Sequence, residues 1–443
     1  MNLKPDEVQF HSASMIDSVG RLFSWNGSLY RAINKDSAAF CLDLFEKKRI
    51  QDLFSKGLIE TEIAPLSLEG YGLVLKHRRI PFESYCMEWT GDMLKDAALL
   101  LCDLSLELLE RGLTFKDAHP WNILFDGGTP IFVDWGSLGR LEESLAWPYL
   151  EFRNRFLFPL FLISSGRCSI TRDFMFDTVD SPWRGDIFRL MLNRIPFSRW
   201  LRYLWVDDHL KKGSVITTQL FLEKLRKSVQ SIPLVADKTD WSSYNGPGEI
   251  VPTMTAESWP PKIRAVQSLL QRIKPGTVMD IGCNRGWFSE LAAREGAQVV
   301  AIDLDEPSLS ALYQKVRSNG SSILPLFMDI VRATPTYGLM EAYRSAKERL
   351  RVDMVLALAL THHLVFKRGL RFEGIAGLLA GFTKRWLLVE FVPPDDQYVR
   401  EWMNERFSWY HLDGFQRALK GIFSRIEIVN SYPSPRVLLL CER

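Results

Sequence analysis

The sequence has 443 residues, a length typical of two or three domains rather than one. Hydrophobic residues make up 47% and charged residues 24%, which excludes a chain that is mostly disordered. Lys and Arg total 55 against 53 Asp and Glu, so the net charge of +2 gives no electrostatic footprint for nonspecific nucleic-acid binding. We expect no nucleic-acid partner.

The six cysteines are widely spaced and contain no CxxC pair, so the sequence indicates neither a disulfide framework nor a thiolate zinc site. The N-terminus lacks the basic and apolar regions of a secretory signal. The most lipophilic run, 156–163, has eight residues and contains Pro159, whereas a membrane helix needs about 20 apolar residues. We therefore predict a cytoplasmic protein without a membrane span; the sequence does not predict its oligomeric state.

A stretch rich in Ser, Thr, Pro and Gly at 228–255 separates two regions, and we place the domain boundary near 235, giving domains 1–235 and 236–443. The C-terminal region alternates apolar runs with helical patterns, as an α/β protein with a largely parallel sheet does. Seven strands are predicted, at 277–282, 298–303, 322–328, 353–360, 385–392, 424–430 and 436–442.

The last two predicted strands are separated only by SYPSP, residues 431–435. A parallel crossover needs about a dozen residues or more, so the seventh strand must run antiparallel to the sixth. The other connections are long enough for helices.

The first strand of this region leads into a glycine loop that is directly followed by a helical pattern. The loop reads DIGCNRG and contains Asp280, Gly282, Asn284 and Gly286, and the second strand ends in Asp303. Glycine lets the backbone turn sharply and approach a ligand, and a helix N-terminus offers free N–H groups. A carboxylate after the second strand can accept hydrogen bonds from both hydroxyls of a ribose.

These motifs resemble the class I S-adenosylmethionine-dependent methyltransferases, over about residues 255–443. The resemblance implies a seven-stranded Rossmann-like sheet whose last strand is antiparallel, and S-adenosyl-L-methionine as cofactor. It also implies roles for single residues: the amino acid part of the cofactor would lie against Asp280, Gly282, Cys283, Asn284 and Gly286, the ribose against Asp303 and the adenine against Asp329. Asn284 replaces the family's middle glycine, and Asn tolerates positive φ better than most residues. A dinucleotide site would want GxGxxG, which GCNRGW does not supply.

The residues after strands four and five should face the methyl acceptor, because ligands of open α/β sheets bind beyond the carboxyl ends of the strands. Strand four runs into His362 and His363, and strand five contains Glu390. A histidine suits the removal of a proton from an oxygen or nitrogen nucleophile. Adjacent side chains of an extended segment point to opposite faces, so at most one histidine should face the cofactor. Glu390 either orients a histidine, binds a substrate hydroxyl or lies at a solvated strand end.

The phrases LALALTHHL and VEFVPPDD resemble a bacterial subgroup of these methyltransferases, nodulation-associated and biosynthetic-cluster members, which carry a kinase-like N-terminal half. Residues 113–137 contain Asp117, then Asn122 five residues later, then Asp134-Trp135-Gly136. This spacing resembles the protein kinase catalytic loop and its metal-binding triplet. The resemblance implies an α+β domain with Asp117 as base, Asn122 and Asp134 as magnesium ligands, and ATP as a second ligand.

The small lobe of such a domain is incomplete in the sequence. Residues 21–33 predict a hairpin with an Asn-Gly turn and residues 37–55 a helix, but no glycine-rich phosphate loop precedes them. The strand that should carry the phosphate-pairing lysine offers only Arg31 or Lys35.

Three functions remain open at this point. The first is a methyltransferase acting on an oxygen or nitrogen of a small molecule or glycan, with the kinase-like half positioning this acceptor. The second is a bifunctional enzyme that phosphorylates and then methylates. The third is a noncatalytic binding or regulatory module.

Overall fold

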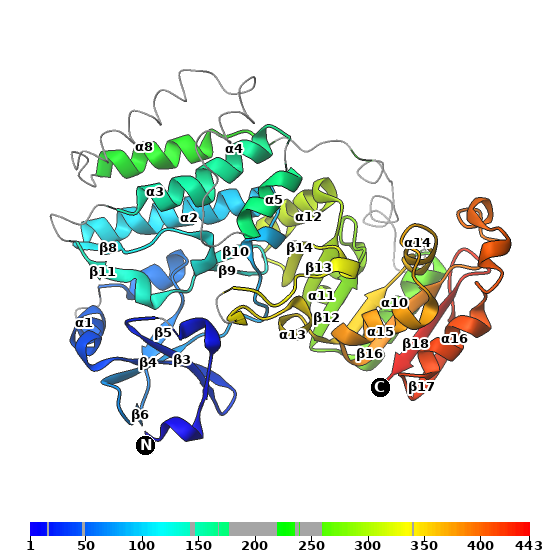
Figure 1. Cartoon of the computed structure of the whole chain (residues 1–443), viewed down its shortest axis with the longest axis horizontal. Helices are drawn as coiled ribbons and strands as arrows, with labels where there is room; N and C mark the ends of the chain where they lie inside the picture. Colours follow the sequence, from blue (N-terminus) through cyan, green and yellow to red (C-terminus); the bar gives the residue numbers. More distant parts are fainter. Residues whose placement is uncertain are drawn as a thin grey trace. The chain divides into compact units, whose positions relative to one another are not determined.

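The computed structural model describes residues 1–15, 17–46, 49–141, 147–166, 168–176, 219–234, 239, 259–338 and 341–443. The chain divides into two compact units (Figure 1). Unit 1 comprises residues 1–237 together with 337–343, and unit 2 comprises 238–336 and 344–443. The boundary predicted near 235 lies outside the described residues.

Unit 1 combines short sheets, antiparallel except for the parallel β1–β6 pair, with a mainly helical part. Its largest sheet has the strand order β2-β3-β4-β7-β5, and β1–β6, β8–β11 and β9–β10 form separate pairs. The strands are β1 Asn2–Leu3, β2 Gln9–Phe10, β3 Gly20–Trp25, β4 Ser28–Ile33, β5 Thr61–Ile63, β6 Ser67–Leu68, β7 Leu73–His77, β8 Leu113–Phe115, β9 Ile123–Asp126, β10 Thr129–Phe132 and β11 Leu138–Arg140. The helices are α1 Lys35–Glu46, α2 Gly91–Glu110, α3 Tyr149–Phe152, α4 Phe158–Ser164, α5 Cys168–Phe176 and α8 Gln219–Gln230.

The predicted hairpin over 21–33 is confirmed as β3 and β4. Asn26 and Gly27 both have positive φ, 46° and 75°, which is the backbone that a two-residue hairpin turn requires. The single helix predicted over 37–55 is wrong in part, because α1 ends at Glu46 and a separate 3₁₀ helix covers Gln51–Lys56.

Helix α2 is the longest of the helices that the structure describes in unit 1 (Figure 1). The Thr90 side chain caps its first turn by accepting a hydrogen bond from the Met93 backbone N–H at 3.3 Å. Buried leucines and alanines such as Leu94, Ala97 and Leu101 recur at helical spacing and turn one face of α2 inward. The helix ends just before β8, which leads into the segment containing Asp117 and Asn122.

Unit 2 is built on a mixed sheet of seven strands, in the order β14-β13-β12-β15-β16-β18-β17. All seven predicted strands are confirmed within a few residues: β12 Thr277–Ile281, β13 Gln298–Asp303, β14 Ile323–Phe327, β15 Val352–Ala357, β16 Thr383–Phe391, β17 Arg425–Asn430 and β18 Val437–Glu442. Strands β12 to β16 pair in parallel, whereas β18 is antiparallel to both β16 and β17. The short connection between β17 and β18 therefore makes these two strands antiparallel, as predicted.

Helices pack against this sheet and close its core. They are α10 Pro261–Ile273, α11 Trp287–Arg294, α12 Glu306–Asn319, α13 Ala346–Arg349, α14 Thr361–Phe366, α15 Phe372–Phe382 and α16 Leu412–Lys420. Helices α10, α11 and α12 share one buried cluster with alternate residues of the strands, including Val278, Met354 and Leu356. Alternation follows from the two-residue period of a strand, and it places every second strand residue under these helices.

The fold of unit 2 is therefore α/β, with the topology that the sequence predicted. Among the described residues, no helix combines the length and the apolar character that crossing a membrane requires.

Gly286 fixes the approach of α11 to α12 and can be tested by substitution. It has φ +76°, and a Cβ atom there would lie 2.5 Å from Cδ1 of Leu312, which is buried. We expect Gly286→Ala to lower the free energy of unfolding by about 2–3 kcal/mol, through strained φ and overpacking together. Gly296→Ala is the matched control, because φ is +92° there but no atom lies within 4 Å of the added Cβ. Its free energy of unfolding should fall by only about 1 kcal/mol. Equal losses in urea unfolding would contradict the packing argument.

Candidate functional site

The glycine loop after β12 is fastened to the end of β13 by one carboxylate. Asp303 accepts hydrogen bonds from the backbone N–H groups of Asn284 at 2.7 Å, Leu304 at 2.7 Å and Asp305 at 2.9 Å. The loop residues Gly282, Asn284 and Gly286 all have positive φ. Asn284, at φ 49°, thus adopts the conformation for which the sequence analysis judged it suitable.

Asp280 lies at the buried base of the same loop. Its carboxylate accepts a hydrogen bond from the Ser289 hydroxyl at 2.7 Å, and Ser289 belongs to the first turn of α11. Burial raises the pKa of Asp280 to about 6, and the neighbouring Asp303 adds to the rise, while the Ser289 hydrogen bond and the Lys262 charge oppose it. The ionised form therefore needs a positive partner.

Cys283 and Asp329 complete the set predicted around the loop. The Cys283 thiol is buried, which raises its pKa well above the ordinary value, so the side chain is a packing group in this structure. Asp329 follows β14 and caps the turn Ile330–Arg332 by accepting from the Val331 N–H at 3.0 Å. It also forms an ion pair with Arg368.

The three carboxylates that the resemblance assigns to the cofactor lie at one edge of the sheet, where each can accept hydrogen bonds. Asp280 lies in β12, Asp303 ends β13 and Asp329 follows β14, and these three strands are neighbours in the sheet. Parallel strands bring their carboxyl ends to one edge, so the three carboxylates and the loop N–H groups share that edge. The residues thus fit the cofactor that the sequence analysis expected.

The two histidines lie on a helix, not on the extended segment that the sequence analysis assumed. Helix α14 begins at Thr361, and the rings of His362 and His363 are 4.1 Å apart at their centroids. The prediction that the two histidine side chains point to opposite faces of an extended segment is therefore wrong. Both rings also contact Trp402, with centroids at 6.0 and 5.6 Å. Burial lowers the pKa of His362 to about 3 and that of His363 to about 4, so both are neutral at pH 7.

Glu390 is fully buried within β16 and is not a solvated strand end. One oxygen accepts from the Lys262 ammonium at 2.5 Å and the Ala359 N–H at 2.8 Å, and the other accepts from the Ser431 hydroxyl at 2.6 Å. Ala359 has φ 52° at the turn between β15 and α14. The Glu390 side chain therefore ties β16 to three other segments of the chain, those of Lys262, Ala359 and Ser431.

Two largely buried cations of this region, Lys262 and Arg436, could not be predicted from the sequence. Lys262 and Arg436 lie 128 and 40 residues from their partners, Glu390 and Asp396. Arg436 donates to Asp396 at 2.7 and 3.1 Å, and both side chains are buried. Such pairs leave no periodic signal in the sequence. The local features are a lysine that follows two prolines, Lys262, and an arginine that precedes the last strand, Arg436.

In unit 1, the structure brings together the residues of the second motif. The Asn122 side-chain amide donates to the Asp117 carboxylate at 2.7 Å. Ser137 connects to the same segment, since its hydroxyl donates to the Asp117 carbonyl at 3.3 Å. Asp134 caps the turn Trp135–Ser137 by accepting from the Gly136 N–H at 3.0 Å.

Arg31, and not Lys35, lies beside Asp134. The Arg31 guanidinium is buried and pairs with Asp17 and, at 3.3 Å, with Asp134. Lys35 is exposed at the start of α1. Burial raises the pKa of Asp134, and the positive charge of Arg31 opposes that rise.

The predicted magnesium ligands are Asn122 and Asp134. Within the ranges that the structure describes, no group of three or more His, Cys, Asp or Glu side chains is placed to hold a metal ion. Asn122 and Asp134 supply two oxygens, and a buried guanidinium already lies against Asp134. Mg²⁺ in nucleotide sites takes one or two protein carboxylates and fills its other positions with water and substrate phosphates, so the magnesium site stays a prediction.

Comparison with known proteins agrees with the geometry of unit 2. Residues 279–372 match the family described as "Methyltransferase domain". The nodulation protein NoeA of Rhizobium meliloti is 27% identical over 475 aligned positions, covering 98% of this chain and 96% of NoeA. The bifunctional methyltransferase/kinase WbdD of Escherichia coli, an O-antigen chain terminator, is 27% identical over 126 residues, covering 28% of this chain and 16% of WbdD. A crystal structure of WbdD aligns with a TM-score of 0.30 and 19% identity, covering 40% of this chain and 38% of that one.

Asp280 should make stability depend on pH. The pKa of Asp280 is about 6 in the folded protein and near 4 in the unfolded chain, so the folded state favours the protonated carboxyl. The stability that Asp280 contributes is therefore present at low pH and is lost as the pH rises through 6. We therefore compare the free energies of unfolding of Asp280→Asn and the parent in urea, without ligands. The difference in favour of the variant should grow by about 1 kcal/mol when the pH is raised from 5 to 8. The exposed Asp413→Asn variant is the control. A gain that does not change with pH would contradict the assigned pKa.

Proposed function

Since the chain carries a methyltransferase domain, we propose that it transfers a methyl group from S-adenosylmethionine to an oxygen or nitrogen of a small-molecule or glycan acceptor. The observation that carries the proposal is the Asp303 carboxylate, which accepts from three backbone N–H groups and holds the glycine loop open at the sheet edge. We further propose that residues 1–235 position the acceptor and residues 236–443 bind the cofactor.

We assign the cofactor contacts along the neighbouring strand ends. Ionised Asp280, whose burial demands a positive partner, suits the ammonium group of the cofactor. Gly282, Cys283, Asn284 and Gly286 present the loop backbone to the same part of the ligand, Asp303 accepts from the ribose hydroxyls and Asp329 from the adenine amino group. When bound, the cofactor supplies the electrophilic methyl carbon of its sulfonium.

The acceptor side lies beyond β15 and β16. His362 and His363 are neutral at pH 7, so either ring can accept a hydrogen bond or a proton from the nucleophile. His363 is the more exposed of the two and is our first choice for contact with the acceptor. Glu390 acts through the backbone: by holding the Ala359 N–H at 2.8 Å it fixes the turn from which the histidine helix starts.

For unit 1 we propose a degenerate kinase-like domain. The Asp117–Asn122 contact keeps the geometry of a catalytic loop, while Arg31 beside Asp134 supplies positive charge where a kinase binds metal. The alignment with NoeA extends over 98% of the chain, so that relative matches both units together. Such a unit can recognise an acceptor without phosphorylating it.

The central test is cofactor binding. Asp303→Ala removes the acceptor of three backbone N–H groups, and we expect the affinity for S-adenosylmethionine in calorimetry to fall at least a hundredfold, since the loop loses its anchor as well as the ribose contact. The exposed Asp413→Ala variant should bind as the parent does. Equal binding by Asp303→Ala and parent, or binding by neither, would contradict the proposal.

A second candidate is a bifunctional kinase-methyltransferase, favoured by the Asp117–Asn122 contact and by the likeness to WbdD. Because Arg31 lies against Asp134, we expect Mg-ATP at millimolar concentration to leave the melting temperature unchanged. A magnesium-dependent rise in melting temperature that disappears in Asp134→Asn would instead favour the bifunctional enzyme. ATP without magnesium is the control for nonspecific stabilisation.

A further inference from the structure

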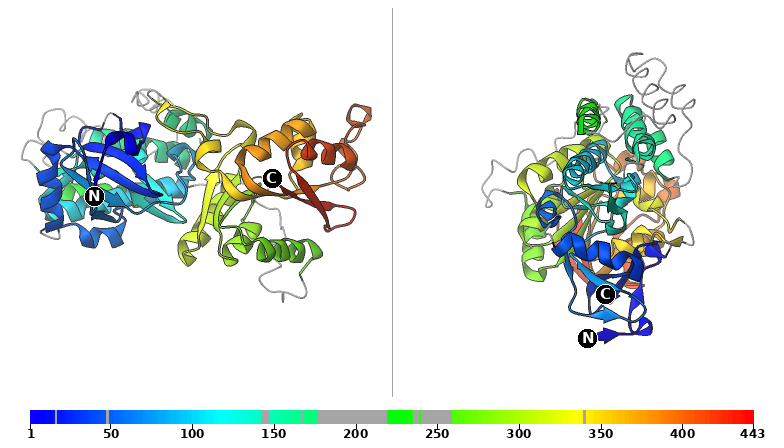
Figure 2. Two further views of the ribbon diagram at one scale, coloured as in Figure 1. Left: turned by 90° about the horizontal axis from the view of Figure 1, so that it is seen from below. Right: turned by 90° about the vertical axis from the view of Figure 1, so that its left-hand side faces the viewer.

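Lys262 lies at the start of α10, and its side chain is only 13% exposed. Its ammonium donates to the Glu390 carboxylate at 2.5 Å. Glu390 lies in β16, an inner strand of the sheet between β15 and the C-terminal strand β18 (Figures 1 and 2). An ammonium has three N–H donors, and no further hydrogen bond of this one is present among the residues that the structure describes. A cation that has lost most of its water needs further acceptors.

The Lys262 ammonium lies beside the helix that follows the glycine loop. Its Nζ atom is 5.5 Å from the centroid of the Phe288 ring, in the first turn of α11. The next residue is Ser289, whose hydroxyl donates to the Asp280 carboxylate at 2.7 Å. Burial raises the pKa of Asp280, and the positive charge of Lys262 opposes that rise, which agrees with this position. Lys262 is thus near the carboxylate to which we assigned the ammonium group of the cofactor.

The partner of Lys262 is joined to the histidine helix. Glu390 accepts from the Ala359 N–H at 2.8 Å, and Ala359 lies at the turn before α14. The next residue, Leu360, reaches the glycine loop, since a Cβ atom on Gly282 would lie 3.6 Å from its Cδ1 atom. The Lys262–Glu390 pair therefore connects to the glycine loop on one side and to the start of the histidine helix on the other.

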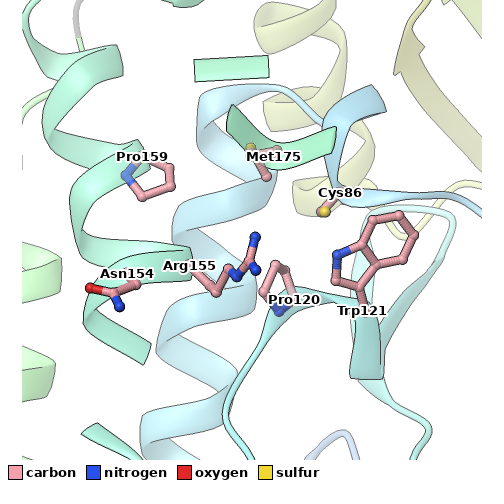
Figure 3. Close-up of a pocket in the computed structure, with 7 residues that line it drawn as sticks. All are labelled: Cys86, Pro120, Trp121, Asn154, Arg155, Pro159 and Met175. Carbon is pink, nitrogen blue, oxygen red and sulfur yellow. The ribbon is translucent and has the colours of Figure 1, made fainter. Parts of the chain in front are cut away.

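Other cations of the chain lie elsewhere. In unit 2, Arg436 donates to both oxygens of Asp396, at 2.7 and 3.1 Å. Arg155 belongs to unit 1, where it lines a pocket (Figure 3). Lys262, by contrast, combines a place beside the glycine loop with N–H donors that Glu390 does not use.

The amino acid part of S-adenosylmethionine carries an ammonium and a carboxylate on the same carbon atom. Asp280 is a partner for the ammonium only, so the carboxylate needs a donor close by. A charge that enters a largely buried site is tolerated when an opposite charge and hydrogen bonds compensate it. The spare donors of Lys262 meet this requirement, and they leave the Glu390 contact in place.

We propose that Lys262 binds the carboxylate of the cofactor and, through Glu390, joins that carboxylate to the turn from which the histidine helix starts. The assignment rests on the proposed function, because it names the contact by which the same site distinguishes its cofactor from nucleosides that lack a carboxylate. With the cofactor bound, Lys262 is held from both sides. The turn at Ala359 is then more rigid, so the histidines are positioned for the acceptor after the cofactor has bound.

Calorimetry on the full chain tests the contact with two probes, S-adenosylhomocysteine and its decarboxylated form, which keeps the amine and the nucleoside. We expect the parent to bind S-adenosylhomocysteine about tenfold more tightly, because the other probe lacks a charge-assisted hydrogen bond. Lys262→Met should weaken binding of S-adenosylhomocysteine about tenfold and change that of the decarboxylated probe less than about twofold. Lys262→Arg should retain most of the preference. Lys420→Met, at an exposed lysine of α16, should bind as the parent does.

A second variant keeps the test valid if Lys262→Met folds poorly, since that change leaves the buried Glu390 carboxylate without its cation. The double variant Lys262→Met/Glu390→Gln removes both charges and should lose the preference in the same way. Glu390→Gln alone retains the ammonium, so it should still prefer the probe with the carboxylate.

Hydrogen exchange of residues 355–366 tests the connection to the histidine helix. S-adenosylhomocysteine should slow exchange in this segment about threefold or more in the parent, because the turn at Ala359 becomes harder to open. The decarboxylated probe should not slow it, and S-adenosylhomocysteine should not slow it in Glu390→Gln, where the charged link is missing.

The possible results separate this assignment from the proposed function. If the parent binds both probes equally, or if Lys262→Met keeps the preference, the role of Lys262 is wrong while the proposed function stands. A preference without slower exchange at 355–366 would overturn the connection through Glu390. If neither probe binds to the parent, the proposed function is wrong, and the role of Lys262 with it.

Discussion

The Asp303 carboxylate is the constraint on which the conformation of the glycine loop depends. Three backbone N–H groups, from the glycine loop and from the turn after β13, converge on its two oxygens. Hydrogen bonds to an ionised acceptor are roughly twice as strong as neutral ones, so the loop is held in a backbone conformation of repeated positive φ that it would otherwise resist. The loop then presents its edge to a ligand without having to reorganise.

Buried charge pairs hold the segments around the histidine helix α14 in the same way. Glu390 is balanced by Lys262, and Asp396 by Arg436, and in each pair the carboxylate is almost completely buried. Burying two charges is costly, so such pairs specify a geometry more than they add stability. Here they fix the turn at Ala359 and the segment after β16, between which the histidine helix lies.

In unit 1, two contacts hold the residues of the second motif. Asp117 and Asn122 remain in contact, yet Asp134 faces a guanidinium from β4. A fixed positive charge near a carboxylate replaces part of what a bound cation would supply, without coordination geometry or dissociation.

The sequence alone determined the features that depend on local order. Strand periodicity, the short SYPSP connection and the Asn-Gly turn predicted all seven strands of unit 2, the antiparallel last strand and the hairpin β3–β4. The glycine loop and the strand-end carboxylates were found in the same way, because parallel strands bring their ends to one edge. These patterns are set by neighbours along the chain.

Only the tertiary structure decided which distant groups meet. It placed His362 and His363 on a helix, buried Glu390 against Lys262, chose Arg31 over Lys35 as the partner of Asp134, and returned residues 337–343 to unit 1. The Glu390–Lys262 and Arg31–Asp134 pairs join segments that are far apart along the chain, and no periodic signal in the sequence predicts such pairs. The reason is physical: a buried charge or donor must find a partner wherever packing brings one, and packing is not written in local spacing.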